Sequence, residues 1–255
     1  MIVIKTREEI DKMRILGSQA AQILETLKSK ARIGVTTREL DDLCMEECDK
    51  IEAKASSYGY YGFPGHLCIS INETIIHGIP GSRKLKDGDM VSLDLVIERD
   101  GLFVDTAITF VVGVPTNIQR KLIDVCQNAL NAGITEVRSG NRIGDIGFAI
   151  QTTVEKAGFS VIREYIGHGV GHSMHEDPQV PNFGKQGMGV KITPGMTFAI
   201  EPMISQGHWA VEVEEDGWTV NTADHSLSCH FEHTVATTED EPIVLTNKFV
   251  KKEVL

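Results

Sequence analysis

The chain of 255 residues has no long apolar run and little positive charge. No apolar stretch approaches the ~18 residues that a membrane-spanning helix requires, so we expect no transmembrane segment and no membrane partner. The N-terminus has no cationic start followed by an apolar core, so no secretory signal is predicted. Because 25 lysines and arginines face 36 aspartates and glutamates, the net charge is −11, which argues against nucleic-acid specificity.

Cysteine is scarce, and several catalytic motifs are missing. The five cysteines are an odd number without a Cys-x-x-Cys pair, which disfavours a disulfide framework and a thiolate zinc site and favours a reducing cytoplasm. No Gly-x-Ser-x-Gly elbow occurs, so a serine hydrolase triad is unsupported. The glycine-rich GHGVGHS lacks the Gly-Lys-Ser/Thr ending of a phosphate-binding loop.

The expected secondary structure has the same order twice, two helices followed by several strands. Two Thr-x-x-Glu capping boxes, beginning at Thr6 and Thr36, open the first two helices. Asp100-Gly101, between two apolar runs, predicts a tight hairpin. The helices are expected through residues 10–27, 40–51, 118–137 and 143–157, and the strands over 68–71, 90–97, 102–112, 161–166, 197–204, 210–213, 218–222 and 230–237.

The repeated order extends to the residues themselves. The stretch KLKDGDMVSLDL aligns with KITPGMTFAIEP at an offset of 107 residues and places Asp94 on Glu201. At an offset of 127, VDTAITF aligns with FEHTVAT and places Asp105 on Glu232. A His-x-x-Pro pattern also occurs in each half. The halves therefore agree in two acids and one histidine each.

This repeat predicts the architecture of the chain. Two halves with the same order of elements bring their equivalent residues together if they fold around a pseudo-twofold axis. No linker or low-complexity segment separates the halves. We therefore expect a single catalytic α+β domain over residues 1–255, with halves of about 1–113 and 114–255.

The duplicated acids predict a metal centre. Asp94 lies in the apolar run VSLDLVI, where a carboxylate is costly unless it is paired or bound to a metal. The hairpin puts Asp94 and Asp105 on one face, where unpaired carboxylates repel each other or one takes up a proton, and a divalent cation resolves both problems. Around a pseudo-twofold axis Glu201 and Glu232 converge on them, and His168 of GHGVGH is a candidate fifth ligand.

Four carboxylates and one imidazole make an oxygen-rich site. Such a set suits Mn, Co or Fe at least as well as Zn, and bridging carboxylates can hold two ions roughly 3.5–4 Å apart. A pair of ions of this kind makes hydroxide from water near neutral pH and polarises a carbonyl or phosphoryl oxygen. The residues by themselves therefore predict a two-metal hydrolase.

Five motifs together resemble a known family. CISINETIIHGIP, VSLDLVIERDGLFVDT, GHGVGHSMHEDPQVPNF, FAIEPMI and DGWTVNTADHSLSCHFEHT look like the type I methionine aminopeptidases of the minimal, bacterial kind, over essentially the whole chain. The resemblance implies the pita-bread fold and a cytoplasmic, monomeric enzyme that removes the initiator methionine from nascent chains when the second residue is small. Contact with the ribosome is expected for such an enzyme. The resemblance implies that the two divalent ions are held by Asp94, Asp105, His168, Glu201 and Glu232.

The resemblance also implies roles for individual side chains. Glu201 is expected to carry a proton from the attacking water toward the leaving amine. His175 is expected to donate a hydrogen bond to the scissile carbonyl oxygen as charge develops on it, and His77 to contact the peptide group at the scissile bond. The resemblance assigns the methionine pocket to Tyr60, Phe63, Cys68 and Trp218, and a monovalent cation site to Asn72, Thr74 and Ser228.

Some positions depart from the usual family pattern, and two alternatives stay open. Ser57, Tyr61, Phe63 and His172 differ, which affects the expected pocket shape and inhibitor selectivity but not the reaction. One alternative is a proline-directed aminopeptidase or prolidase of the same fold, which normally carries a separate N-terminal domain that this chain has no room for. The other is a non-catalytic protein of this fold, which the presence of every ligand and both histidines disfavours.

Overall fold

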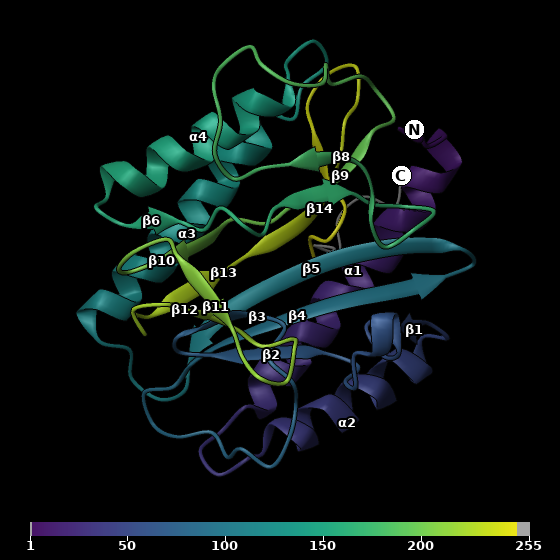
Figure 1. Ribbon diagram of the computed structural model, residues 1–255. Helices are drawn as coiled ribbons and strands as arrows, with labels where there is room; N and C mark the ends of the chain where they lie inside the picture. The colour runs from purple at the N-terminus through teal and green to yellow at the C-terminus, as the bar shows by residue number, and fades with distance from the viewer. Residues whose placement is uncertain (1, 249–255) are drawn as a thin grey trace.

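The computed structural model describes residues 2–248 and is built around one large sheet with helices on one side (Figure 1). The helices are α1 (Arg7–Lys30), α2 (Thr37–Lys50), α3 (Asn117–Thr135) and α4 (Ile143–Lys156), with a short 3-10 turn η1 (Tyr60–Gly62). The strands are β1 (Lys54–Ala55), β2 (Cys68–Ile71), β3 (Thr74–Ile76), β4 (Met90–Arg99), β5 (Leu102–Val111), β6 (Ser160–Val161), β7 (Gly167–Gly169), β8 (Glu176–Val180), β9 (Thr197–Ile200), β10 (Met203–Ser205), β11 (Val211–Val213), β12 (Val220–Thr222), β13 (Ser228–His230), β14 (Glu232–Ala236) and β15 (Ile243–Val244).

The central sheet has nine strands in the order β1-β4-β5-β14-β9-β7-β8, with β2 also paired to β4 and β15 to β14. Two three-stranded sheets, β13-β10-β6 and β11-β12-β3, lie beside it. The pairings are antiparallel, as in an α+β protein. Strands from the two parts of the chain meet where β5 pairs with β14.

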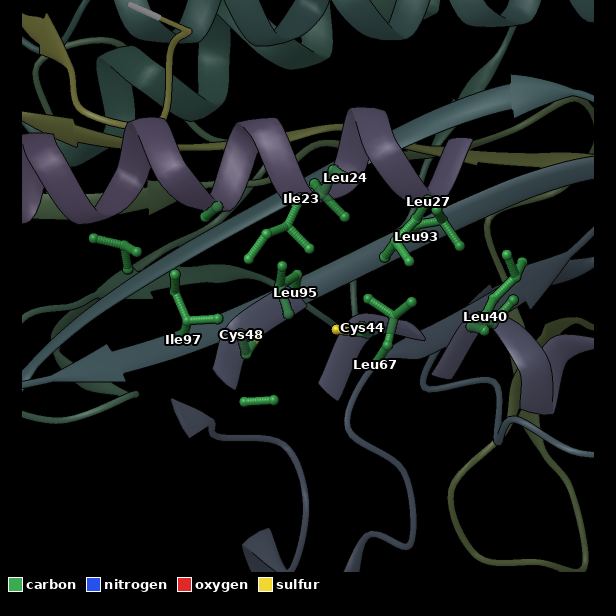
Figure 2. Close-up of a cluster of buried hydrophobic side chains, with 14 of the residues drawn as sticks. Ile23, Leu24, Leu27, Leu40, Cys44, Cys48, Leu67, Leu93, Leu95 and Ile97 are labelled. Atoms are coloured by element: carbon green, nitrogen blue, oxygen red, sulfur yellow. The ribbon is translucent and has the colours of Figure 1, made fainter. Parts of the chain in front are cut away.

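The helices cover the sheet and form two hydrophobic cores. α1 packs on β4 and β5 and contacts α2, whereas α3 packs on α4 and contacts β9 and β14. Figure 2 shows the first core, in which Ile23, Leu24 and Leu27 of α1 lie near Leu93 and Leu95 of β4. Among residues 2–248, no helix is long and apolar enough to cross a membrane.

The helix starts follow from the predicted capping boxes. The Thr6 hydroxyl accepts a hydrogen bond from the Glu9 N–H at 3.2 Å, and the Glu9 carboxylate accepts one from the Thr6 N–H at 2.7 Å. Thr36 and Glu39 make the same two bonds at 3.1 and 2.7 Å. These bonds satisfy N–H groups that have no partner inside the helix, so α1 and α2 begin where the sequence predicts.

The β4–β5 hairpin turns at Asp100-Gly101 as predicted. Both residues have positive φ, 55° and 76°, as a two-residue hairpin turn of type I′ requires. The turn sets the register, in which Asp94 pairs with Ala107. Asp105, two residues before Ala107, therefore lies diagonally from Asp94 on the same face of the sheet.

The prediction of continuous strands over 197–204 and 230–237 was wrong. The first is broken into β9 and β10, and the second into β13 and β14. Pro202 has no N–H and ends the first ladder. At both breaks the chain passes between the central sheet and the β13-β10-β6 sheet, and Glu201 and Glu232 lie at these crossings. β6 and β12 are also shorter than predicted.

Equivalent backbone contacts recur at nearly the predicted offset. The Gly34 N–H donates to the Leu85 carbonyl at 2.8 Å, and the Gly140 N–H donates to the Ile192 carbonyl at 3.0 Å. Both glycines have positive φ, 90° and 96°, a conformation that favours residues without a Cβ. The boundary between the halves stays a prediction, and the two ends of the predicted domain lie outside the described residues.

Candidate metal and peptide site

One cavity of about 640 Å³ gathers most of the residues that the sequence predicts for the site. Its wall contains Asp94 and Asp105 from the β4–β5 hairpin, His168 from β7, and Glu201 and Glu232 from the two strand crossings. Residues from both halves of the chain therefore meet in one place. The same wall also contains Ser57, Tyr60, Phe63, Cys68, His77, His175 and Trp218.

The four carboxyl groups lie close together, with Asp105 and Glu232 buried and Asp94 and Glu201 half-buried. Burial raises the pKa of Asp94 to about 7, although a hydrogen bond with Asp105 opposes the shift. Burial and then the charge of Asp94 raise the pKa of Asp105 well above its usual value. Burial, followed by repulsion from Asp105, also raises the pKa of Glu201 and that of Glu232. Carboxyl groups in this setting resist ionisation unless a cation joins them.

His168 directs its Nε2 atom at these acids. Nε2 lies 3.4 Å from Glu201 Oε1 and 3.8 Å from Asp105 Oδ2. Nδ1 lies 2.9 Å from the Gly169 carbonyl oxygen and donates to it, so Nε2 carries the lone pair. Burial lowers the pKa of His168 to about 3, so the ring is neutral. A lone pair that faces carboxylate oxygens is repelled by them unless a proton or a cation lies between, and a metal ion bound by the ring and the acids removes this repulsion.

Two further observations fit a metal ion. Asp105 Oδ1 and Glu232 Oε1 are buried and have no hydrogen-bond partner within the described part of the chain. One ligand atom each from Asp105, His168 and Glu232 lie within 4.8 Å of one another. Asp94 and Glu201 border this group through their contacts with Asp105 and His168. An oxygen-rich set with one imidazole suits a divalent transition-metal ion.

His175 lies beside the acids but is connected differently. Its ring centroid is 4.2 Å from that of His168, and its Nδ1 is 2.8 Å from the hydroxyl oxygen of Tyr60. When Tyr60 donates to Nδ1, the ring proton is on Nε2, and this N–H can donate to a ligand. Burial lowers the pKa of His175, which favours the neutral ring that this bond requires.

His77 and the predicted methionine pocket form one aromatic wall. The His77 ring packs edge-on against Tyr165 at 5.8 Å and against Trp218 at 6.1 Å. Trp218 also packs edge-on against Phe63 at 5.2 Å. Burial lowers the pKa of His77 to about 4 and raises the pKa of the Cys68 thiol, so both groups are neutral. A pocket of this kind accepts an apolar side chain.

Two of the four residues that depart from the family pattern do not line this cavity. Ser57 and Phe63 line it, whereas Tyr61 is 86% exposed and His172 bonds to Glu9 on α1. Tyr61 and His172 therefore do not line the cavity themselves, and their effect on its shape stays a prediction. The Tyr61 ring packs edge-on against the Tyr60 ring at 4.7 Å, on the solvent-exposed side of a residue that lines the cavity.

Asn72, Thr74 and Ser228 lie together outside the cavity. The Ser228 hydroxyl oxygen lies 3.1 Å from the carbonyl oxygen of Asn72 and 2.8 Å from that of Thr74, and its single proton is available to these two acceptors. The Thr74 hydroxyl donates to Asn221 at 2.8 Å, and the Asn72 side chain accepts from the Met90 N–H at 2.9 Å. The carbonyl oxygens of Asn72 and Thr74 therefore both face the Ser228 hydroxyl, and the monovalent cation site stays a prediction.

Sequence reasoning missed the residues that support the acids. Asn182 donates to the carbonyl oxygen of Glu201 at 3.0 Å. The Thr234 hydroxyl accepts from the Asp105 N–H at 2.9 Å and donates to the Asp105 carbonyl at 2.8 Å. An isolated Asn or Thr has no periodicity or motif that marks it, so no signal in the sequence could have found these bonds.

Clustered buried carboxyl groups, an inward-facing imidazole and an adjoining peptide-sized cavity define a metal-dependent hydrolase. The chain belongs to metallopeptidase family M24, whose model matches residues 11–239. It is accordingly a peptide hydrolase that depends on divalent metal.

Within that family the chain is similar to the methionine aminopeptidases. It is 47% identical over 246 residues to the methionine aminopeptidase of Clostridium perfringens, a match that covers 96% of this chain and 99% of the relative. It superimposes on the crystal structure of methionine aminopeptidase from Rickettsia prowazekii with a TM-score of 0.95 at 40% identity, covering 97% of this chain and 100% of that one. The predicted resemblance and the predicted pita-bread fold are confirmed.

The prolidase alternative is not favoured. The prolidase from Pyrococcus horikoshii shares 19% identity and a TM-score of 0.79, and the match covers 98% of this chain but 65% of the prolidase. At that identity the likeness shows the fold alone.

Proposed function

We propose that this chain removes the N-terminal methionine from newly made proteins whose second residue is small. The observation that carries the proposal is the single cavity in which five metal-ligand candidates lie beside an aromatic pocket. The names of its relatives support the same substrate. We propose Asp94, Asp105, His168, Glu201 and Glu232 as the ligands of two divalent ions, drawn from Mn, Co, Fe and Zn.

The buried oxygens support this ligand set. Asp105 and Glu232 each have one carboxyl oxygen without a partner in the described chain, and a metal bond satisfies such an atom. When bound, divalent ions supply Lewis acidity and lower the pKa of a coordinated water. The remaining chemistry falls to the protein's own side chains.

Each of those side chains has a role that matches its surroundings. Glu201, as a carboxylate, takes up a proton from the attacking water and passes it to the leaving amine. His175, held through Nδ1 by Tyr60, presents Nε2–H to the scissile carbonyl oxygen. His77, packed against Tyr165 and Trp218, contacts the peptide group at the scissile bond. The methionine side chain is held by Tyr60, Phe63, Cys68 and Trp218.

The wider setting follows from the same activity. We propose nascent polypeptide N-termini as the substrates, with the ribosome as a contact, and a monomer in the cytoplasm as the working state. The five free cysteines are consistent with a reducing compartment. We also propose that Asn72, Thr74 and Ser228 hold a monovalent cation, and that residues 1–255 form a single catalytic domain.

Metal analysis combined with two peptides tests the proposal. Purified protein with Mn or Co should release methionine from a Met-Ala-led peptide and leave an Ala-Pro-led peptide intact. Release of alanine from the second peptide alone would support the proline-directed alternative. Failure to cleave either peptide at full metal loading would favour a non-catalytic protein.

A further inference from the structure

The loop that carries His175 is tied to the N-terminal segment of the chain. Residues 170–175 connect β7 to β8, and Glu176 follows His175 directly. The Lys5 ammonium forms an ion pair with the Glu176 carboxylate, 171 residues away in the sequence. Their side chains are 1% and 6% exposed, so this is a buried pair. Removing one partner of a buried ion pair leaves an unpaired buried charge, which destabilises a protein far more than breaking an exposed pair does.

Glu176 uses its second oxygen to order the loop. Glu176 Oε1 accepts hydrogen bonds from the N–H groups of His172 at 2.6 Å and Ser173 at 3.1 Å. The Glu176 carboxylate therefore binds the loop backbone through one oxygen and Lys5 through the other. The fit is close, since a Cβ on Gly171 would lie 2.1 Å from Lys5 Cε.

The N-terminal segment is itself anchored on the rest of the protein. The Lys5 N–H donates to the Gly195 carbonyl at 2.8 Å, and the Lys5 ammonium also donates to the Val3 carbonyl at 3.2 Å. A second link joins the same loop to the start of α1, where His172 Nε2 lies 2.7 Å from Glu9 Oε1. Lys5 therefore connects a fixed part of the fold to the residue next to His175.

We propose that Lys5 is a positioning residue for His175. It acts through Glu176: the ion pair holds the loop, and the loop holds the His175 ring against Tyr60 and beside His168. Lys5 does not line the cavity and so does not touch substrate. This inference rests on the role proposed for His175. Its consequence is that Lys5 affects the chemical step and leaves substrate binding and metal content alone.

Lys5→Met tests the inference, because methionine keeps most of the side-chain length and removes the charge. We expect kcat on a Met-Ala-led peptide to fall roughly tenfold to a hundredfold, the range for small misplacement of a reacting group. KM should stay within about twofold, because the substitution removes no contact that binds the substrate and the transition state equally. The metal content should equal that of the unmodified protein. Lys12→Met is the matched control: it breaks the exposed Lys12–Glu8 pair, 2.8 Å apart on α1, and should leave kcat unchanged.

A double-mutant cycle separates positioning from a general loss of stability. If Lys5 acts through His175, Lys5→Met should cost nothing further in kcat once His175→Ala is present. In 15N NMR of histidine side chains, Lys5→Met should also shift the His175 Nδ1 resonance, whereas Lys12→Met should not. Should Lys5→Met fail to fold, Glu176→Gln keeps an acceptor oxygen for the loop and should give the same pattern in milder form.

The outcomes distinguish this inference from the proposed function. An unmodified protein that does not release methionine overturns the proposed function, and this inference with it. An active unmodified protein whose Lys5→Met variant keeps its kcat overturns the inference alone. Equal losses of kcat from Lys5→Met with and without His175→Ala also overturn it, because they show a purely structural role.

Discussion

His168 and His175 have rings only 4.2 Å apart, and we predict that they do different work. His175→Ala should lower kcat by about 10²–10³, the usual cost of removing one oxyanion donor, which is roughly 2.7–4 kcal/mol. Its metal content should be unchanged, because the only ring nitrogen bonded in the described chain is Nδ1, and its partner is Tyr60. His168→Ala should instead lose metal, because Nε2 of that ring faces Glu201 at 3.4 Å.

Removing the hydrogen bond between Tyr60 and His175 should lower kcat by a smaller factor than removing the His175 ring. Tyr60→Phe keeps the ring that lines the pocket and removes the hydroxyl 2.8 Å from Nδ1. A neutral hydrogen bond contributes about 0.5–1.5 kcal/mol net, so kcat should fall roughly 2- to 10-fold while KM changes little. Tyr58→Phe is the control: Tyr58 is 57% exposed and stacks on His66.

The assay is steady-state cleavage of a Met-Ala-led peptide, with metal content measured on the same samples by mass spectrometry. Loss of metal from His175→Ala together with full metal in His168→Ala would refute the assignment and reverse the two roles. An undiminished kcat in His175→Ala would show that this ring donates nothing to the reacting carbonyl.

Three further predictions concern metal, packing and specificity. A chelator should abolish peptidase activity and Mn or Co should restore it, so full activity in rigorously metal-free protein would contradict the metal site. Gly17→Ala should destabilise the fold by about 1–3 kcal/mol in urea unfolding, because its Cβ would lie 2.5 Å from the Leu245 carbonyl oxygen. Gly81→Ala, with open space around its Cβ, should be nearly neutral. A bulky second residue should reduce kcat/KM by about 10²-fold relative to Met-Ala, because it displaces the carbonyl from attack geometry; equal rates on Met-Ala and Met-Leu peptides would rule that out.

The sequence alone predicted a metal-dependent hydrolase, because the residues of the site occur in local patterns and in an internal repeat. Burying the Asp94 carboxylate inside the apolar run VSLDLVI costs free energy in any fold that buries this strand. An acid at the equivalent position of the repeat, Glu201, indicates that both belong to a functional site. The capping boxes and the Asp100-Gly101 turn act over three or four residues, so α1, α2 and the diagonal pairing of Asp94 with Asp105 followed without tertiary information.

The tertiary structure decided what depends on contacts between distant residues. Tyr60 and His175 are 115 residues apart, and Lys5 and Glu176 are 171 apart, so no periodicity or motif relates them. The strand break before Glu232 was likewise invisible, because an apolar run that changes sheets looks the same as one that continues in a single sheet, whereas Pro202 marks the break at Glu201. A residue's type and its neighbours in sequence determine which chemistry is available, whereas the packing of separate elements determines which nitrogen faces a substrate and which lysine holds it there.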